Sequence, residues 1–225
     1  MSAIYVDSIK DKSDTKTLAT LSSSTVTLHT DVTVPATTSA CEKLYANDVS
    51  GVASFSVDGY FDDTKYGFYE MHINEVKVST SADVNNFLGR VNTSGSAMDG
   101  SIYWSASVGM YNNNGTATTM DRADNDGSTY FNTDNTWDIP NTNEQYRRNN
   151  YALRFSNPQS TSSYFTCNIH SYGNGHEGSE AYDAWVSTTG VSVVTLSSIS
   201  GFTFYMQAST SSILSAEILL LGFKK

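Results

Sequence analysis

Apolar and polar side chains alternate along much of the chain after residue 40, which is the pattern of strands with one buried face. Successive side chains of a strand point to opposite faces of a sheet, so every second residue is expected to face a core. Residues 66–80 and 164–171 show this pattern clearly. The sets expected to face the core are Tyr69, Met71, Ile73 and Glu75 in the first stretch and Phe165, Cys167 and Ile169 in the second.

Further stretches carry the same strand pattern and are separated by clusters of turn-forming residues. The predicted strands are residues 49–60, 66–80, 85–91, 102–111, 151–155, 164–171, 182–186, 191–196, 202–207 and 213–223. No stretch has a convincing helical period, and no repeat is visible that would indicate a propeller or a solenoid. The pattern therefore predicts an all-β fold, a two-sheet antiparallel jelly-roll sandwich.

Residues 1–40 differ from the rest of the chain. They contain no Gly, Trp or Phe and only short apolar pieces, with a strand-like alternation in residues 25–32. Such a segment has too few large apolar groups to build a core, so we expect an extended N-terminal arm held by a neighbouring chain or a partner surface. The side chains expected to anchor it are Ile4, Val6, Ile9, Leu18, Val26 and Leu28.

Residues 41–225 are expected to form the sandwich domain. Within it, residues 112–150 contain clusters of Asn, Asp and Gly and little strand signal. We therefore expect a long loop excursion there, of the kind that often contacts a ligand or a partner.

The composition agrees with an all-β protein, and the charge excludes one class of partner. Ser and Thr make up 59 of the 225 residues, whereas the chain has only 8 Lys, 5 Arg and 7 Glu. Thr, Tyr, Val and Phe suit a pleated sheet, and Ser, Asn, Asp and Gly suit its turns. The net charge is −10, and because no basic cluster is present, nucleic acid is not expected as a partner.

The sequence shows neither a secretory signal nor an apolar run long enough to cross a membrane, so we expect a soluble protein without membrane insertion. Cys41 and Cys167 are expected to be buried free thiols, with a long-range disulfide as the alternative.

Sequence motifs of catalysis are missing. The chain has no Gly-x-Ser-x-Gly, no phosphate-binding Gly-rich loop, no His-Glu-x-x-His and no Cys-x-x-Cys. We therefore expect no enzyme and no cofactor, with carbohydrate cleavage by two carboxylates as the alternative. No metal site is expected, because a turn is the simpler interpretation of Asp124 and Asp126, and exposed loop histidines that of His170 and His176; both pairs stay open as metal ligands.

The aromatic residues indicate a function better than the catalytic motifs or metal ligands do. Sugar recognition combines ring stacking with paired hydrogen bonds from neighbouring polar groups. Trp104 and Trp185 lie in predicted strands and are expected to fill the core, whereas Trp137 lies in the predicted loop. The residues expected to contact a partner surface are Trp137, Tyr172, His170 and His176.

Both ends of the chain carry a resemblance. The opening, IYVDSIKD at residues 4–11 followed by TLAT at 17–20, resembles the start of many virion proteins of marine bacteriophages. The closing segments, ISGFTFY at 199–205 and ILSAEILLLGF at 213–223, resemble the last two strands of a jelly-roll family found in phage tail fibres and related appendages. Segments between them that fall in a similar order are residues 66–91, 102–104 and 155–158.

The resemblance implies a virion structural protein that is not an enzyme, assembled in the host cytoplasm and carried in the virion. It implies a homo-oligomer, since such appendages are commonly trimers, that attaches to other virion proteins of the tail or capsid through its N-terminal arm. The sandwich of this tail-fibre-like or head appendage would then contact the host surface, and a host cell-surface glycan is the candidate partner. Two alternatives stay open: a capsid decoration or cement protein, and a free carbohydrate-binding or carbohydrate-cleaving β-sandwich.

Overall fold

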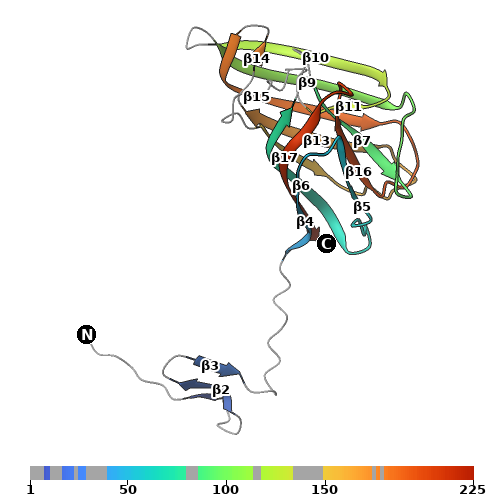
Figure 1. Ribbon diagram of the computed structural model, residues 1–225. Helices are drawn as coiled ribbons and strands as arrows, with labels where there is room; N and C mark the ends of the chain where they lie inside the picture. Colours follow the sequence, from blue (N-terminus) through green and yellow to red (C-terminus); the bar gives the residue numbers. More distant parts are fainter. Residues whose placement is uncertain are drawn as a thin grey trace. The chain divides into compact units, whose positions relative to one another are not determined.

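The structure, a computed structural model, describes residues 8–10, 17–22, 25–28, 40–79, 86–113, 118–133, 149–173, 176–177 and 180–225. The chain divides into two compact units, Met1–Ser39 and Ala40–Lys225. In the described residues all regular elements are strands, as the alternating pattern predicts (Figure 1). None of those residues belongs to a helix that is long and apolar enough to cross a membrane.

The first unit contains a small antiparallel sheet in strand order β1-β2-β3. Its strands are β1 (Ser8–Lys10), β2 (Thr17–Ser22) and β3 (Thr25–Leu28). Ile9 pairs opposite Ala19, and Leu21 pairs opposite Val26. Of the residues expected to anchor the arm, Ile9, Leu18, Val26 and Leu28 lie in these strands, and Ile4 and Val6 lie outside the described residues.

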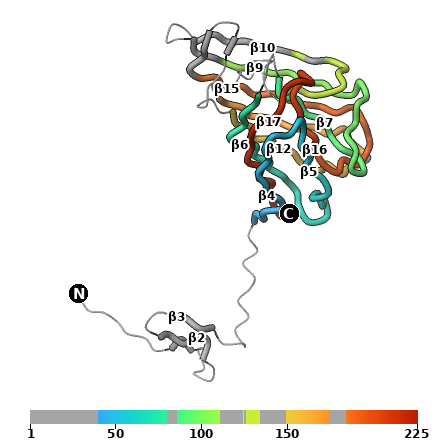
Figure 2. The backbone as a smooth tube through the Cα atoms, viewed as in Figure 1, coloured from blue at the N-terminus to red at the C-terminus, as the bar shows by residue number. Residues whose placement is uncertain are grey.

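The larger sheet of the second unit is antiparallel and has the order β10-β9-β15-β13-β12-β6-β17-β4, with β14 added to β15. The last strand along the chain, β17, lies between β6 and β4 (Figure 2), and β4 is the first strand of the sandwich. The strands are β4 (Cys41–Val49), β6 (Tyr66–Ser79), β9 (Tyr103–Asn113), β10 (Thr118–Ser128), β12 (Asn149–Phe155), β13 (Phe165–Gly173), β14 (His176–Glu177), β15 (Glu180–Val193) and β17 (Ser212–Lys224).

The smaller sheet of this unit has the order β11-β7-β16-β5, with β8 paired to β7. Its strands are β5 (Ser54–Asp58), β7 (Phe87–Thr93), β8 (Ser96–Ala97), β11 (Phe131–Asn132) and β16 (Gly201–Met206). Together the two sheets confirm the expected all-β, two-sheet antiparallel sandwich.

Aromatic rings from the two sheets meet in the core. The ring centroid of Phe202 in β16 lies 5.2 Å from that of Phe155 in β12, and Phe87 in β7 lies 5.0 Å from Tyr151 in β12. All four side chains are buried. Large aromatic groups remove much apolar area from water, so this layer contributes strongly to stability in a chain that is rich in small polar residues.

The face expected to be buried is confirmed for Tyr69, Met71 and Ile73, but the prediction is wrong for Glu75. Glu75 is only partly buried and has φ 57°, in the left-handed region. A bulge at this point shifts the register of β6 against both neighbouring strands, so the buried positions move to Val76. One inserted residue reverses the order in which side chains face the core.

The region expected to form a long loop, residues 112–150, contains strand β10 and the short strand β11. This corrects the prediction in part. Asp and Asn favour turns locally, but the backbone of β10 pairs with β9 from Thr118 opposite Asn112 to Asn125 opposite Ser105. Pairing with the preceding strand β9 therefore outweighed the local turn preference.

Two further boundaries differ from the prediction. The strands expected at 182–186 and 191–196 are one strand, β15, because Thr189 and Gly190 continue the pairing with β13 without a turn. The stretch 49–60 is divided between the end of β4 and β5, and most of β4 was not predicted. Cys41 and Cys167 are thiols that form no disulfide, as expected; the expected burial is confirmed for Cys167 and wrong for Cys41, which is partly exposed.

Candidate ligand-binding face

The larger sheet has one face toward the core and one face toward solvent, called here the outer face. In β9, Tyr103 and Ser105 are buried, whereas Trp104 is 49% exposed. The prediction that Trp104 fills the core is therefore wrong, and the same prediction is confirmed for Trp185, which is 4% exposed. Trp104 and Tyr103 are both aromatic, so the local pattern did not tell which of the two faces inward.

A hollow of about 560 Å³ lies on the outer face where four adjacent strands cross it, and we call it the outer-face groove. Its volume is within the range of small-ligand sites. The lining residues are Trp104, Ser105 and Ala106 of β9, Asp124 and Asp126 of β10, Thr166 and Cys167 of β13, and Gly190, Val191 and Ser192 of β15.

Gly190 and Ala106, two small residues on one cross-strand row, form the floor of the groove. Asn168 pairs opposite Gly190, Gly190 opposite Ala106, and Ala106 opposite Asp124. The neighbouring row carries the larger Trp104, opposite Ser192. The hollow therefore arises because small side chains on one row lie beside a large aromatic side chain on the next row.

Gly190 is not required by the backbone. Its φ is outside the left-handed region, and the nearest atom to an added Cβ would be the carbonyl oxygen of Ala106 at 3.9 Å, an ordinary contact. A glycine inside a strand costs about 0.5–1 kcal/mol relative to Ala. The register shows no bulge at Gly190, and a strand glycine without a steric or bulge reason is consistent with close approach of a ligand to the sheet.

The groove offers stacking and hydrogen-bond acceptors. Asp124 and Asp126 are exposed carboxylates, Thr166 and Ser192 carry hydroxyl groups, and Trp104 supplies an aromatic surface. No Lys, Arg or His is among the described lining residues. This combination suits a ligand with both apolar faces and many hydroxyl or amino donors.

A charged cluster lies on the same outer face beyond Asn168. Glu70 Oε1 is 2.7 Å from His72 Nε2, and Glu70 Oε2 accepts a hydrogen bond from Arg154 Nε at 3.1 Å. Arg154 pairs opposite Asn168, which places this cluster on the cross-strand row that leads to Gly190. The carboxylate of Glu70 thus balances the cation nearest to the groove along this row.

Two of the residues expected to contact a partner lie on the outer face but do not line the groove. Tyr172 is 55% exposed, and His170 is also exposed, with Nδ1 3.1 Å from Thr188 Oγ1. Trp137 lies outside the described residues, and the side chain of His176 is not described. In the described part of the chain, no group of three or more His, Cys, Asp or Glu is arranged to hold a metal ion.

The residues that sequence reasoning missed are therefore Trp104, Gly190 and the acidic pair of β10. Asp124 and Asp126 were interpreted as turn residues, but both belong to β10. A strand glycine without a turn signal around it was the available indication, since Gly190 lies between Thr189 and Val191 in a β-branched stretch.

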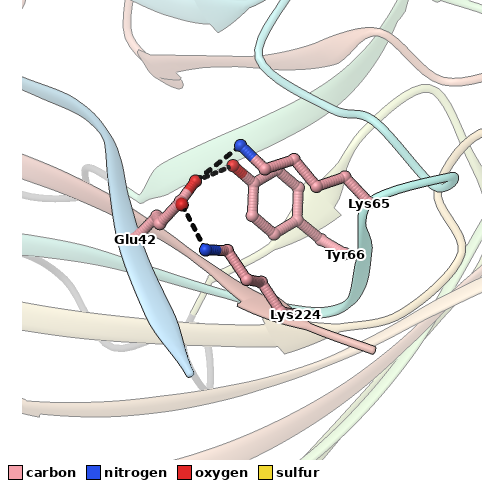
Figure 3. Close-up of polar contacts among 4 residues, drawn as sticks. All are labelled: Glu42, Lys65, Tyr66 and Lys224. Atoms are coloured by element: carbon pink, nitrogen blue, oxygen red, sulfur yellow. Dashed lines mark hydrogen bonds and ion pairs between the residues drawn. The ribbon is translucent and has the colours of Figure 1, made fainter. Parts of the chain in front are cut away.

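A second polar cluster joins the first and last strands of the sandwich (Figure 3). Glu42 of β4 accepts hydrogen bonds from Lys65 Nζ at 2.7 Å, Lys224 Nζ at 2.6 Å and the Tyr66 hydroxyl. Hydrogen bonds from Lys224 first, then from Lys65 and Tyr66, lower the pKa of Glu42 from 4.5 to about 2. The carboxylate is therefore fully ionised at neutral pH, and we assign this cluster a structural role.

Comparison with known proteins gives little similarity. No protein family model matches the chain, and no curated protein matches it. Among solved structures, the chain is similar to the CBM2 module of the evolved Dit of Lactobacillus casei BL23 phage J-1, at 11% identity over 81% of this chain and 78% of that chain. The TM-score is 0.25, too low for this similarity to carry an argument, so the proposed function depends on the residues of this chain.

Proposed function

We propose that this protein binds saccharides without cleaving them, and that the outer-face groove is the binding site. One observation carries the proposal: the half-exposed indole of Trp104 stands beside a groove floor lowered by Gly190. The apolar face of a sugar ring stacks on an aromatic ring, while its hydroxyls need acceptors close by. Asp124 and Asp126 are such acceptors at the groove.

Binding without hydrolysis is supported by the position of the two carboxylates. Asp124 and Asp126 both come from β10 and are two residues apart, so they line the groove from the same strand. Glycoside hydrolysis needs two carboxyl groups that flank the scissile bond from different sides. The pair suits hydrogen bonding to one side of a bound sugar.

The sequence resemblance to phage virion proteins favours a place on a phage particle, as a tail-fibre-like or head appendage. In this proposal, residues 1–39 attach the chain to other virion proteins, and the sandwich offers the groove to a host cell-surface glycan. The division of the chain into two compact units supports such a division of roles. A homotrimer would carry three grooves, and their combined avidity would exceed the affinity of one groove.

The binding proposal is tested with a glycan array followed by calorimetric titration of the best ligand. Trp104→Ala is expected to weaken binding by at least about 10-fold, the scale of an aromatic side chain at the centre of an interface. Gly190→Val is expected to fill the groove floor and abolish binding while keeping the fold. The matched control is Tyr164→Ala, an exposed aromatic residue that does not line the groove. Release of reducing ends from the ligand, or undiminished binding by Gly190→Val, would contradict the proposal.

The attachment proposal is tested by deletion of residues 1–39. We expect the remaining sandwich to keep its cooperative unfolding and its glycan binding, and to lose incorporation into particles and trimer formation. Light scattering after size exclusion measures the oligomeric state. Unchanged incorporation of the truncated protein would overturn the anchoring role of the first unit.

A further inference from the structure

The described side chains that line the outer-face groove carry charge of one sign. Among the described lining residues the ionisable groups are the thiol of Cys167 and the carboxylates of Asp124 and Asp126, and both aspartates are exposed. No cationic side chain is among the described lining residues. A ligand in the groove therefore lies beside two negative charges and beside the aromatic face of Trp104.

The cross-strand row that forms the groove floor also carries a cation, Arg154, but this cation does not offset the charges of Asp124 and Asp126. Arg154 lies two strands from Gly190 on that row, and Glu70 accepts a hydrogen bond from its guanidinium. The chain as a whole has a net charge of −10, which adds a negative field at long range. An anionic saccharide would approach the groove against both the local carboxylates and this field.

A positively charged ligand is expected to bind more favourably in the outer-face groove. An ammonium group forms charge-assisted hydrogen bonds with carboxylates, and it is attracted to the face of an indole ring. Both kinds of partner line this groove, in Asp124, Asp126 and Trp104. We propose that the groove selects saccharides by charge: it prefers sugars with a free amino group to their N-acetylated counterparts and excludes sugars with carboxylate, sulfate or phosphate groups. This inference rests on the proposed saccharide-binding function.

The test compares oligosaccharides of equal length that differ in charge. Oligomers of glucosamine, of N-acetylglucosamine and of a glucuronate-containing sugar are titrated into the full-length protein near neutral pH, at low and at high salt. We expect the amino oligomer to bind about five-fold more tightly than the acetylated one, which corresponds to a surface ion pair of about 1 kcal/mol. High salt should reduce this ratio toward one, because exposed charges are screened.

Variants assign the selectivity to the groove. The double variant Asp124→Asn with Asp126→Asn should bring the ratio between amino and acetylated oligomers to about one and admit the glucuronate oligomer. Asp48→Asn with Glu217→Gln is the matched control, because these two exposed carboxylates pair opposite each other on β4 and β17 and do not line the groove; this double variant should keep the preference.

The outcomes separate the two proposals. If acidic oligomers bind as tightly as amino oligomers, the charge selection is overturned and the saccharide site stands. If the wild type binds no saccharide of any charge, the proposed function itself fails. Retention of the preference in the Asp124/Asp126 double variant would show that the selectivity arises elsewhere and would also overturn the inference.

Discussion

Lys224 Nζ lies 2.6 Å from Glu42 Oε1, which ties the end of the last strand of the sandwich to the beginning of its first. The backbone strengthens the same junction, because the Lys224 amide donates to the carbonyl oxygen of Ala40 at 2.9 Å. Ala40 is the first residue after the N-terminal unit. The strand that receives the chain from that unit is therefore held by both side-chain and backbone contacts.

The junction predicts a pH dependence of stability. The pKa of Glu42 in the folded protein is about 2, below its ordinary value of 4.5. A carboxyl with a lowered pKa stabilises the folded state above the unfolded pKa, and this contribution is lost as the pH falls toward the folded pKa. Glu42→Gln should therefore lower Tm at pH 7, and the difference from wild type should disappear between pH 4.5 and 2. Thermal unfolding followed by circular dichroism measures it.

Glu217→Gln is the control for this experiment, because Glu217 is an exposed carboxylate in the same strand pair. Its Tm difference should stay small over the same range. A Glu42→Gln difference that is constant from pH 7 to pH 2 would mean that the ionised carboxylate does not stabilise the junction.

The aromatic core predicts a large effect at Phe202. This fully buried ring lies 5.2 Å from Phe155 and 5.9 Å from both Phe61 and Phe165, between centroids. Phe202→Ala removes these contacts and leaves a cavity, so it should lower the free energy of unfolding by about 3–5 kcal/mol. Urea unfolding at constant m-value measures the change. Tyr164→Ala, at an exposed position, should change it by less than about 0.5 kcal/mol.

Two strand glycines should respond in opposite ways to Ala. A Cβ at Gly89 would lie 2.2 Å from Cζ of Phe131, so Gly89→Ala should destabilise the protein by about 1–3 kcal/mol through overpacking. Gly190→Ala meets no close atom and should leave stability unchanged or raise it by up to about 1 kcal/mol. Equal destabilisation by both substitutions would show that Gly190 has a structural role, and would remove the argument that its missing side chain serves a ligand.

The two cysteines should differ in reactivity. Burial raises the pKa of the Cys167 thiol to about 12, so almost no thiolate is present at pH 8. Cys41 is partly exposed. Iodoacetamide should modify Cys41 first in the native protein and Cys167 only after denaturation, as peptide mass spectrometry can determine. Rapid native labelling of Cys167 would mean that the groove wall opens in solution.

The strands with strict alternation could be predicted from the sequence because burial on one face leaves a local signal. Phe165, Cys167 and Ile169 are buried as the pattern predicts. The signal failed where pairing decided the outcome. Glu75 occupies a bulge that depends on two partner strands, and β10 contains Asp and Asn residues whose turn preference is overcome by pairing with β9.

The candidate site was less predictable than the fold. Tyr172 and His170 were expected on a contact surface and do lie on the outer face, but the groove is formed by other residues. Trp104 could not be placed by alternation because Tyr103 beside it is equally able to fill a core. Its exposure follows from pairing opposite Ser192, a contact between residues 88 positions apart.

The sequence by itself determined the strand-forming character of this chain, the polar surface of its sheets and the difference between residues 1–40 and the rest, because each is a sum of local preferences and of burial with a period of two. Only the tertiary structure decided which strands are neighbours. The groove follows from that order, since Trp104 and Asp124 come from one pair of strands, Thr166 and Gly190 come from a second pair much later in the chain, and the two pairs meet through the register of the sheet. Register is set by the whole buried face, so no local stretch contains it.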